Sequence, residues 1–396
     1  SGTSVLVAPR SAGLSQMLNR VTVESERGDI TVERVLAVGG LNAATDSGVV
    51  RLKGVLGGGV KASGETIVVE DAVSATPCLW LLFGWVGGEA CTALPIPAGV
   101  APAKAPLAIL LQPLNLSATG GLILANGTIG ASDTFFNEPS GGCTALEGAW
   151  FLGSLSLDMG IGGGKASMVN VLTLDCNVCK DVASLGAIPW GDLPLSPDAN
   201  LFCACGLAEH GMRFRSTDAS LSASLLIAHA MDARSQSGTL SFTEISLLPS
   251  HGGPNGTVAA AAPPRLHANS SVGHVSINGL IAQKGSASSL EVDLASMGGD
   301  IKAVFSGGAF SGAYQVLSTP KGIGHVGIVV DNTPTANAHG TLGRGNASVT
   351  IRHVDGNVAL ALSTKAPSVF AGISGGLGPL MEGSSSGGRT CGEASE

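Results

Sequence analysis

Hydrophobic and polar residues alternate in short segments along most of the chain, and a glycine stands at or near the start of each segment. The clearest examples are GDITVERV (28–35), SGVVRLKGV (47–55) and SGETIVVEDAV (63–73). Alternation with a period of two places successive side chains on opposite sides of a β-strand, whereas a helix needs a period of about 3.6. These segments therefore predict strands with one buried and one exposed side.

The segments recur at intervals that indicate a repetitive fold. Their leading glycines, Gly28, Gly48 and Gly64, are spaced by twenty and then sixteen residues. Similar phrases return towards the C-terminal end, as in GGDIKAVF (298–305). Repetition at this period without a helical pattern predicts an all-β fold, either a β-solenoid or a sheet built of stacked rungs.

One apolar stretch, ASLSASLLIAHAMDA (219–233), has a composition that a helix would accept. Ser and Thr nevertheless recur at about every second position as the chain enters it, which is typical of a strand with one polar side. We therefore expect strand here as well.

Two insertions interrupt the repeat. The first contains five prolines between Pro95 and Pro113, and proline cannot donate to a central ladder of strands. The second contains four cysteines, and a glycine- and proline-rich stretch further along resembles a linker. The predicted organisation is a β-solenoid over 1–249 with insertions at 74–114 and 175–209, a linker or long loop over 250–270, a second solenoid segment over 271–366, and a Gly/Ser-rich tail over 367–396.

The charge and composition exclude several classes of partner. The chain of 396 residues has 21 Lys and Arg against 29 Asp and Glu, and its net charge is −8. Because nucleic acids and anionic membrane surfaces are bound through clustered cations, and no basic block is present, we expect neither partner. No stretch reaches 18 apolar residues, so we also expect no membrane span.

Eight cysteines predict a disulfide framework. Cys78 and Cys91 flank one short loop and form the natural pair. Cys143 and Cys391 either pair with each other or place one cysteine in a bond to another subunit. Four others, which are Cys176, Cys179, Cys203 and Cys205, could form two local disulfides or a tetrahedral zinc site. The single residue between the last two is unlike a usual zinc knuckle, which favours disulfides and no cofactor.

Five Asn-x-Ser/Thr sequons point to N-linked glycans on an extracellular or cell-surface protein that uses the secretory pathway. The chain starts at Ser1 without Met, so we expect that a signal peptide has been removed. The sequons are at Asn115, Asn126, Asn255, Asn269 and Asn346.

Four phrases resemble the repeats of the putative adhesin family of cell-surface β-solenoid proteins. They are RGDITVERV (27–35), DSGVVRLKGV (46–55), SGETIVVEDAV (63–73) and GGDIKAVFSGG (298–308). The resemblance covers about residues 21–73 and 271–363, which is less than half of the chain. It implies a right-handed parallel β-solenoid at the cell surface without catalytic residues, and the disulfide-stapled, proline-rich loop insertions depart from it.

No enzyme motif has the context that its chemistry needs. GIGHVG (322–327) has the glycine spacing of a dinucleotide site, but a strand-like segment follows it where a helix is required. Parallel β-helices can also process polysaccharides through converging carboxylates or basic residues. Such a site could use Asp293 and Asp300, with His274 and His325 if their rungs are in register. A stacked ladder of outward polar side chains is the simpler account, so we expect no enzyme.

The stretch PCLWLLFGWVGGEAC (77–91) holds two of the four tryptophans. Its aromatic and apolar side chains either cap an open end of the solenoid or contact a neighbouring subunit, because aromatic anchors dominate protein interfaces. The interface residues are Trp80, Leu82, Phe83 and Trp85.

Together these features predict a non-catalytic extracellular structural protein, a glycoprotein that assembles with copies of itself into a filament or surface coat. The alternative is a secreted adhesin that binds surface polysaccharide, followed by a β-helix enzyme that processes polysaccharide.

Overall fold

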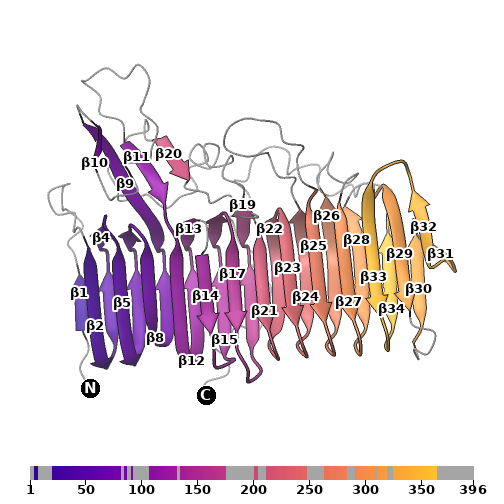
Figure 1. Ribbon diagram of the computed structural model, residues 1–396, viewed down its shortest axis with the longest axis horizontal. Coiled ribbons are helices and arrows are strands. Elements are labelled where there is room, and N and C mark those ends of the chain that lie inside the picture. Colours follow the sequence, from indigo (N-terminus) through magenta and orange to yellow (C-terminus); the bar gives the residue numbers. More distant parts are fainter. Residues whose placement is uncertain are drawn as a thin grey trace.

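The fold is all-β and mostly parallel, as Figure 1 shows for the computed structural model. The structure describes residues 4–7, 20–81, 84–86, 91, 107–131, 134–174, 200–203, 211–247, 263–282, 290–307, 310–318 and 324–363. No α-helix occurs in these ranges, and within them no helix is long and apolar enough to cross a membrane. The all-β class predicted from alternation is therefore confirmed, including strands over most of 219–233.

The strands form three parallel ladders, which we call ladders 1, 2 and 3. Ladder 1 is the longest and carries the candidate site. Its strands, in spatial order, are β2 (Val21–Arg27), β5 (Leu41–Ser47), the first half of β8 (Val60–Glu70), the first half of β12 (Leu114–Asn126), β14 (Thr134–Glu138), β17 (Leu155–Met159), β21 (Met212–Ser216), β23 (Ala230–Ser235), β25 (Arg265–Ser270), β27 (Glu291–Ser296), β33 (Ala347–His353) and β29 (Gly312–Ser318).

We call one pass of the chain through the ladders a rung. Within each rung, ladder 2 follows ladder 1 along the chain. Its strands are β1 (Ser4–Val7), β3 (Ile30–Glu33), β6 (Val49–Lys53), the second halves of β8 and β12, β15 (Cys143–Glu147), β18 (Lys165–Val169), the first parts of β22 (Ser220–Ala228), β24 (Leu240–Leu247), β26 (Val275–Ala282) and β28 (Ile301–Gly307), then β34 (Val358–Leu362) and β30 (Val326–Val330).

Ladder 3 is short-stranded and completes each rung. It contains β4 (Leu36–Ala37), β7 (Leu56–Gly57), the start of β9 (Val73–Leu81), β13 (Ile129–Ala131), β16 (Trp150–Leu152), β19 (Leu172–Leu174) and the last parts of β22, β24, β26 and β28. The chain passes through ladders 1, 2 and 3 in turn and then re-enters ladder 1 one strand further along, as from β5 through β6 and β7 to β8.

A left-handed residue forms the corner between ladders 2 and 3 in nine of the described rungs, with φ between 52° and 83°. Its amide continues the ladder: that of Gly54 donates to the Glu70 carbonyl at 2.9 Å, and that of Gly127 to the Glu147 carbonyl at 3.0 Å. A left-handed φ costs a residue with a Cβ roughly 1–2 kcal/mol. The hydrogen bonds to neighbouring rungs must offset this cost. The residues are Arg34, Gly54, Asp71, Gly127, Gly148, Asn170, Leu225, Glu244 and Gly279.

A Ser-x-x-Gly sequence forms the corner between ladders 1 and 2 in three consecutive rungs. The buried hydroxyl of Ser270 accepts the Gly273 amide at 2.9 Å and donates to the Gly238 carbonyl of the preceding rung at 2.9 Å. Ser235 and Ser296 make the same two bonds in their own rungs. Each serine thus closes its turn and ties it to the rung before.

Most apolar side chains of the three ladders point inwards, and the buried ones form one continuous cluster from Val21 to Leu362. Its largest fully buried members include Phe136, Phe151 and Phe214. The rings of Phe136 and Phe151 meet edge to face, with centroids 5.9 Å apart. The alternation in the sequence has therefore placed its apolar side in one shared core.

Outward side chains on neighbouring strands form rows in which opposite charges pair. On β6 and β8, Lys53 Nζ lies 2.9 Å from a carboxylate oxygen of Glu70. The hydrogen bond to Glu70, followed by the Coulombic attraction of the same carboxylate, raises the pKa of Lys53. Both side chains are about half exposed, so such a pair stabilises the fold only weakly.

The last rung is out of sequence order. β33 lies between β27 and β29, and β34 lies between β28 and β30, although β29 and β30 precede them in the chain. The connecting strands β31 (Thr333–Thr335) and β32 (His339–Leu342) pair antiparallel with the outer edges of β30 and β29. These yellow strands close this end of the row in Figure 1.

A small second sheet projects from ladder 3, beside the row of strands in Figure 1. It consists of β10 (Gly84–Val86), the outer part of β9, β11 (Leu107–Leu111) and β20 (Asn200–Cys203). These strands come from the segments predicted as insertions outside the repeat. Proline explains only in part why these strands leave the repeat, because β9 begins in ladder 3 and continues from there into the second sheet.

Part of the predicted linker over 250–270 belongs to the main sheet. Residues 265–270 form β25, which pairs in register with β23 and β27. The glycines and prolines that indicated a linker all lie before this strand, and RLHANS itself contains neither residue.

We predict that Ser270→Ala lowers the free energy of unfolding by about 1–3 kcal/mol, because it leaves the Gly273 amide and the Gly238 carbonyl without their buried partner. Ser276→Ala, at a half-buried outward position on β26, is the control and should change stability by less than about 0.5 kcal/mol. Urea unfolding of both variants measures the difference, and equal values would contradict the role of the serine corner.

Candidate functional site

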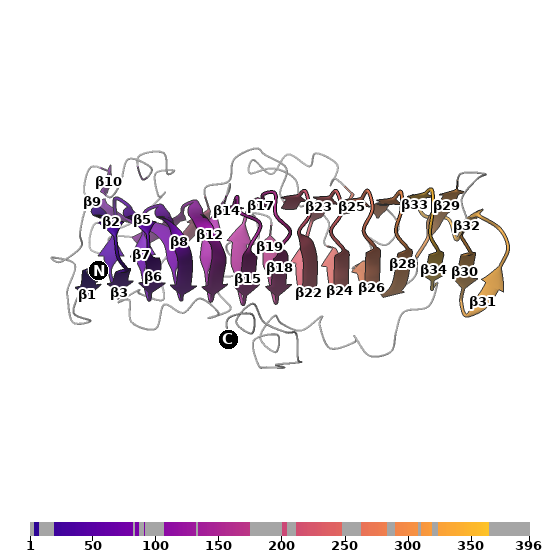
Figure 2. The ribbon, with the colours of Figure 1, turned by 90° about the horizontal axis from the view of Figure 1, so that it is seen from below.

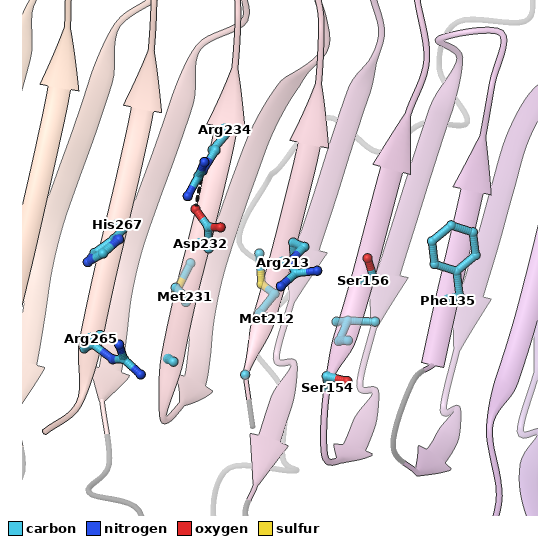
Figure 3. A pocket seen from close by; sticks show the side chains of 13 residues that line it. Phe135, Ser154, Ser156, Met212, Arg213, Met231, Asp232, Arg234, Arg265 and His267 are labelled. Atoms are coloured by element: carbon cyan, nitrogen blue, oxygen red, sulfur yellow. Dashed lines mark hydrogen bonds and ion pairs between the residues drawn. The ribbon is translucent and has the colours of Figure 1, made fainter. Parts of the chain in front are cut away.

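A groove of about 620 Å³ lies on the outer side of ladder 1 and crosses β14, β17, β21, β23 and β25 (Figure 3). Adjacent strands are about 4.8 Å apart, so five strands span roughly 19 Å. The groove is open along the row of strands. Its lining consists of Phe135, Ser154, Leu155, Ser156, Gly211, Met212, Arg213, Ala230, Met231, Asp232, Arg234, Arg265 and His267.

Register aligns the polar lining into a row. Residues in direct register on neighbouring parallel strands stand beside one another, because successive side chains alternate between the core and the outer side. We call this set the central row: it runs through Phe135, Ser156, Arg213, Asp232, His267 and Asp293. The chain thus brings together residues as far apart in sequence as 135 and 293.

Two arginines hold the two carboxylates of the central row. Arg234 Nε donates to Asp232 Oδ1 at 2.7 Å, and Arg352 donates to Asp293 Oδ2. The aspartate side chains are 26% exposed in both pairs, whereas the arginines are more than half exposed. The aspartates therefore orient arginine side chains that still face solvent.

Two polar atoms of the central row lack partners within the described part of the chain. They are His267 Nε2 and Asp293 Oδ1, on strands that are direct neighbours. Both atoms are buried, so a molecule in the groove does not reach them in this arrangement. They mark a polar boundary at the β25 end of the groove.

The groove region carries an excess of positive charge. Arg213 and Arg215 on β21 are exposed, and neither has a salt-bridge partner among the described residues. Arginine offers five donors in a fixed fork and keeps its charge at all ordinary pH values. This arrangement can hold anionic groups. Within the described residues no cluster of His, Cys, Asp or Glu could hold a metal ion.

The candidate catalytic residues from sequence fall into two separate places. Asp293 belongs to the central row of ladder 1. Asp300 lies in the turn before ladder 2, where its amide donates to His274 Nδ1 at 3.0 Å. Asn357 lies between Asp300 and His325 and bonds to both. His274 and His325 therefore lie in the same row of stacked turns, but they are not neighbours.

The arginines of the groove were missed from sequence, although a signal for them exists. The segments MRFRS, AMDARS, RLHANS and EVDLAS each end in a serine at the corner between ladders 1 and 2. Aligning them on that serine places Arg213, Asp232, His267 and Asp293 in one row. Insertions of unequal length between the segments hide this alignment.

No protein-family model, curated protein or solved structure matches the chain.

The disulfide between Cys78 and Cys91 is confirmed. Cys143 is also disulfide-bonded, and its partner lies outside the residues whose side chains are described. The side chain of Cys203 is not described, and Cys176, Cys179, Cys205 and Cys391 lie outside the described residues, so their pairing stays a prediction.

The tryptophan-rich stretch forms a hairpin in the small sheet. Trp80 on β9 and Trp85 on β10 are direct backbone partners, while Leu82 and Phe83 lie outside the described residues. The interface role of all four stays a prediction.

Four of the five sequons fall on described residues. Asn126, Asn269 and Asn346 are exposed, and Asn115 is half-buried in ladder 1 between Lys61 and Phe135. Asn255 lies outside the described residues. Asn269 follows His267 on the outer side of β25, so a glycan there would stand beside the groove.

We predict that expression in a eukaryotic secretory host gives higher glycan occupancy at Asn126 and Asn346 than at Asn115, because a flat, half-buried strand position is poorly accessible. Peptide mass mapping before and after enzymatic release of the glycans measures occupancy at each site. Higher occupancy at Asn115 than at both exposed positions would contradict this placement.

Proposed function

We propose that the chain is a right-handed parallel β-solenoid of an extracellular or cell-surface glycoprotein, and that it binds glycans without cleaving them. The repeated passage through ladders 1, 2 and 3, with strands in register, supports the solenoid. The disulfide Cys78–Cys91 and the exposed sequons support the extracellular location. The resemblance to the putative adhesin family implies the same fold and location, without catalytic residues.

The groove on ladder 1 carries the proposal of glycan binding. It is long and lined by hydroxyl, guanidinium and carboxylate groups beside the apolar ring of Phe135. Sugars present hydroxyls and apolar ring faces together, and aromatic side chains with convergent polar groups suit both. The length of the groove fits a chain of several sugar units better than a single one.

The carboxylates of the site support binding over hydrolysis. A carboxyl group that acts as a general acid must be free to reach the atom that it protonates. Asp232 and Asp293 are each paired with an arginine. They therefore serve to orient Arg234 and Arg352 in the proposed function.

Self-association, on which the predicted filament depends, is a second candidate function. The edge of β2, at one end of the fold, supports it. Among the described strands β2 pairs only with β5, so no described strand covers its outer edge. At the other end β31 and β32 pair antiparallel with the outer edges of the last parallel strands. We propose that copies of the chain meet through the β2 edge, which favours closed dimers over long filaments.

The groove can be tested by filling it without changing its charge. Ala230→Trp places a large side chain among the lining residues, and we expect binding of oligosaccharides on a glycan array to fall by at least about tenfold. Ala359→Trp, at an exposed outward position of β34 on ladder 2, is the matched control and should bind normally. Equal binding by both variants, or none by the native protein, would overturn the proposed function.

The edge of β2 can be tested with a single proline. The Val21 amide points to the next strand, where it donates to Gly40, and amides alternate in direction along a strand. The Glu24 amide therefore points outwards, and Glu24→Pro should turn dimers into monomers in light scattering. Electron microscopy of the unreduced protein, with and without reductant, checks for fibres; long fibres that persist in Glu24→Pro would contradict the β2 contact.

A further inference from the structure

We infer that the ladder 1 groove is selective for acidic glycans, linear polysaccharides that carry carboxylate or sulfate groups. This inference rests on the proposed function, because it names the ligand class of the same groove. The distribution of charge around the groove carries it.

The local charge opposes the charge of the whole chain. The protein has a net charge of −8. On the outer side of β17, β21 and β23, however, three arginines face two aspartates, a local excess of one positive charge. The arginines are Arg213, Arg215 and Arg234, and the aspartates are Asp158 and Asp232. The local charge therefore opposes the long-range repulsion of anions by the chain.

Two of these arginines stand directly beside each other. Arg215 and Arg234 are register partners on β21 and β23. Like charges on neighbouring strands destabilise a sheet, and salt or a bound anion relieves the repulsion. The adjacent pair Arg213 and Asp232 is of opposite sign, but Asp232 already accepts the Nε–H of Arg234 at 2.7 Å. Arg213 thus keeps donors for a ligand.

The positive excess is confined to the groove. Towards the C-terminal end, Arg265 has Glu291 as its register partner, and Arg352 is bound to Asp293. Towards the other end the central row continues through Phe135, Asn115 and Lys61, so it is mostly uncharged. An anionic chain of several units would therefore centre on β21 and β23, where Arg213, Arg215 and Arg234 meet.

The lining favours a glycan over a single-stranded nucleic acid. Proteins that bind single strands stack successive bases on several aromatic side chains, and Phe135 is the one Phe, Tyr or Trp among the described lining residues. The uncharged lining also includes the hydroxyls of Ser154 and Ser156, and Ser156 is the register partner of Phe135. These groups match sugar hydroxyls and ring faces, while the arginines match carboxylate or sulfate.

Titration calorimetry of the full chain at about 0.1 M salt tests the inference. The probes are oligosaccharides of equal length from alginate (carboxylated), heparin (sulfated) and dextran (neutral), together with single-stranded DNA. We expect the acidic glycans to bind at least about tenfold more tightly than dextran. Because exposed charges are screened, this preference should shrink as the salt concentration rises.

One variant that removes a positive charge and one that removes a negative charge distinguish electrostatic recognition from a loss of folding. Arg213→Gln should weaken binding of the acidic probes by about tenfold, whereas Asp232→Asn should strengthen it, since it releases Arg234. Arg51→Gln, which removes the same charge on ladder 2, is the control and should leave affinity unchanged. Thermal melting of each variant confirms that the fold is retained.

The outcomes are distinguishable. Binding of dextran as tight as that of the acidic probes, lost in Ala230→Trp, would overturn the selectivity and leave the proposed function standing. DNA binding tighter than glycan binding would overturn the assignment to glycans. Failure of every probe to bind would overturn both proposals, and weaker binding in Asp232→Asn would contradict the electrostatic mechanism.

Discussion

The whole structure depends on backbone hydrogen bonds between rungs, and these require that every corner turns the chain by the same amount. A buried amide or carbonyl without a partner is costly, so a rung that turned differently from its neighbours would lose bonds on both sides. Two devices keep the corners alike. The left-handed residue between ladders 2 and 3 recurs even where the side chain is that of Leu225 or Glu244. The Ser-x-x-Gly corner binds each turn to the preceding one through a single buried hydroxyl.

This constraint leaves the outer side of ladder 1 free to vary. The inward residues must fill one narrow core, and the corner residues must close the turns, but the outward residues need only tolerate solvent. Charged side chains can therefore collect in register without disturbing the fold, as Arg213, Asp232 and His267 do. The same regularity that stabilises the sheet sets the spacing of these groups at about 4.8 Å. Figure 2 shows how the strands of ladder 1 follow one another evenly along the row.

The two ends of the row differ in how they treat unpaired strand edges. At the C-terminal end the chain moves outwards to build β29 and β30, adds two antiparallel strands, and returns to insert β33 and β34 beneath them. An exposed parallel edge invites pairing with another chain, and this arrangement covers it. At the other end no described strand lies beyond β2, and the strand VTVESER carries charged residues there. The proposed contact between copies of the chain uses the β2 end for this reason.

The sequence by itself determined the class of the fold, because alternation and glycine spacing depend only on neighbouring residues. It also identified the Cys78–Cys91 bond, since the two cysteines flank one short loop, and it separated the proline-rich excursion from the repeat. The groove was decided by the tertiary structure. Arg213 and His267 become neighbours only when rungs separated by insertions of unequal length stack in register, and no local pattern records that register. The position of β33 and β34 could not be predicted from sequence for the same reason. It depends on which strand edges are left to pair, and the composition of the strands does not indicate this.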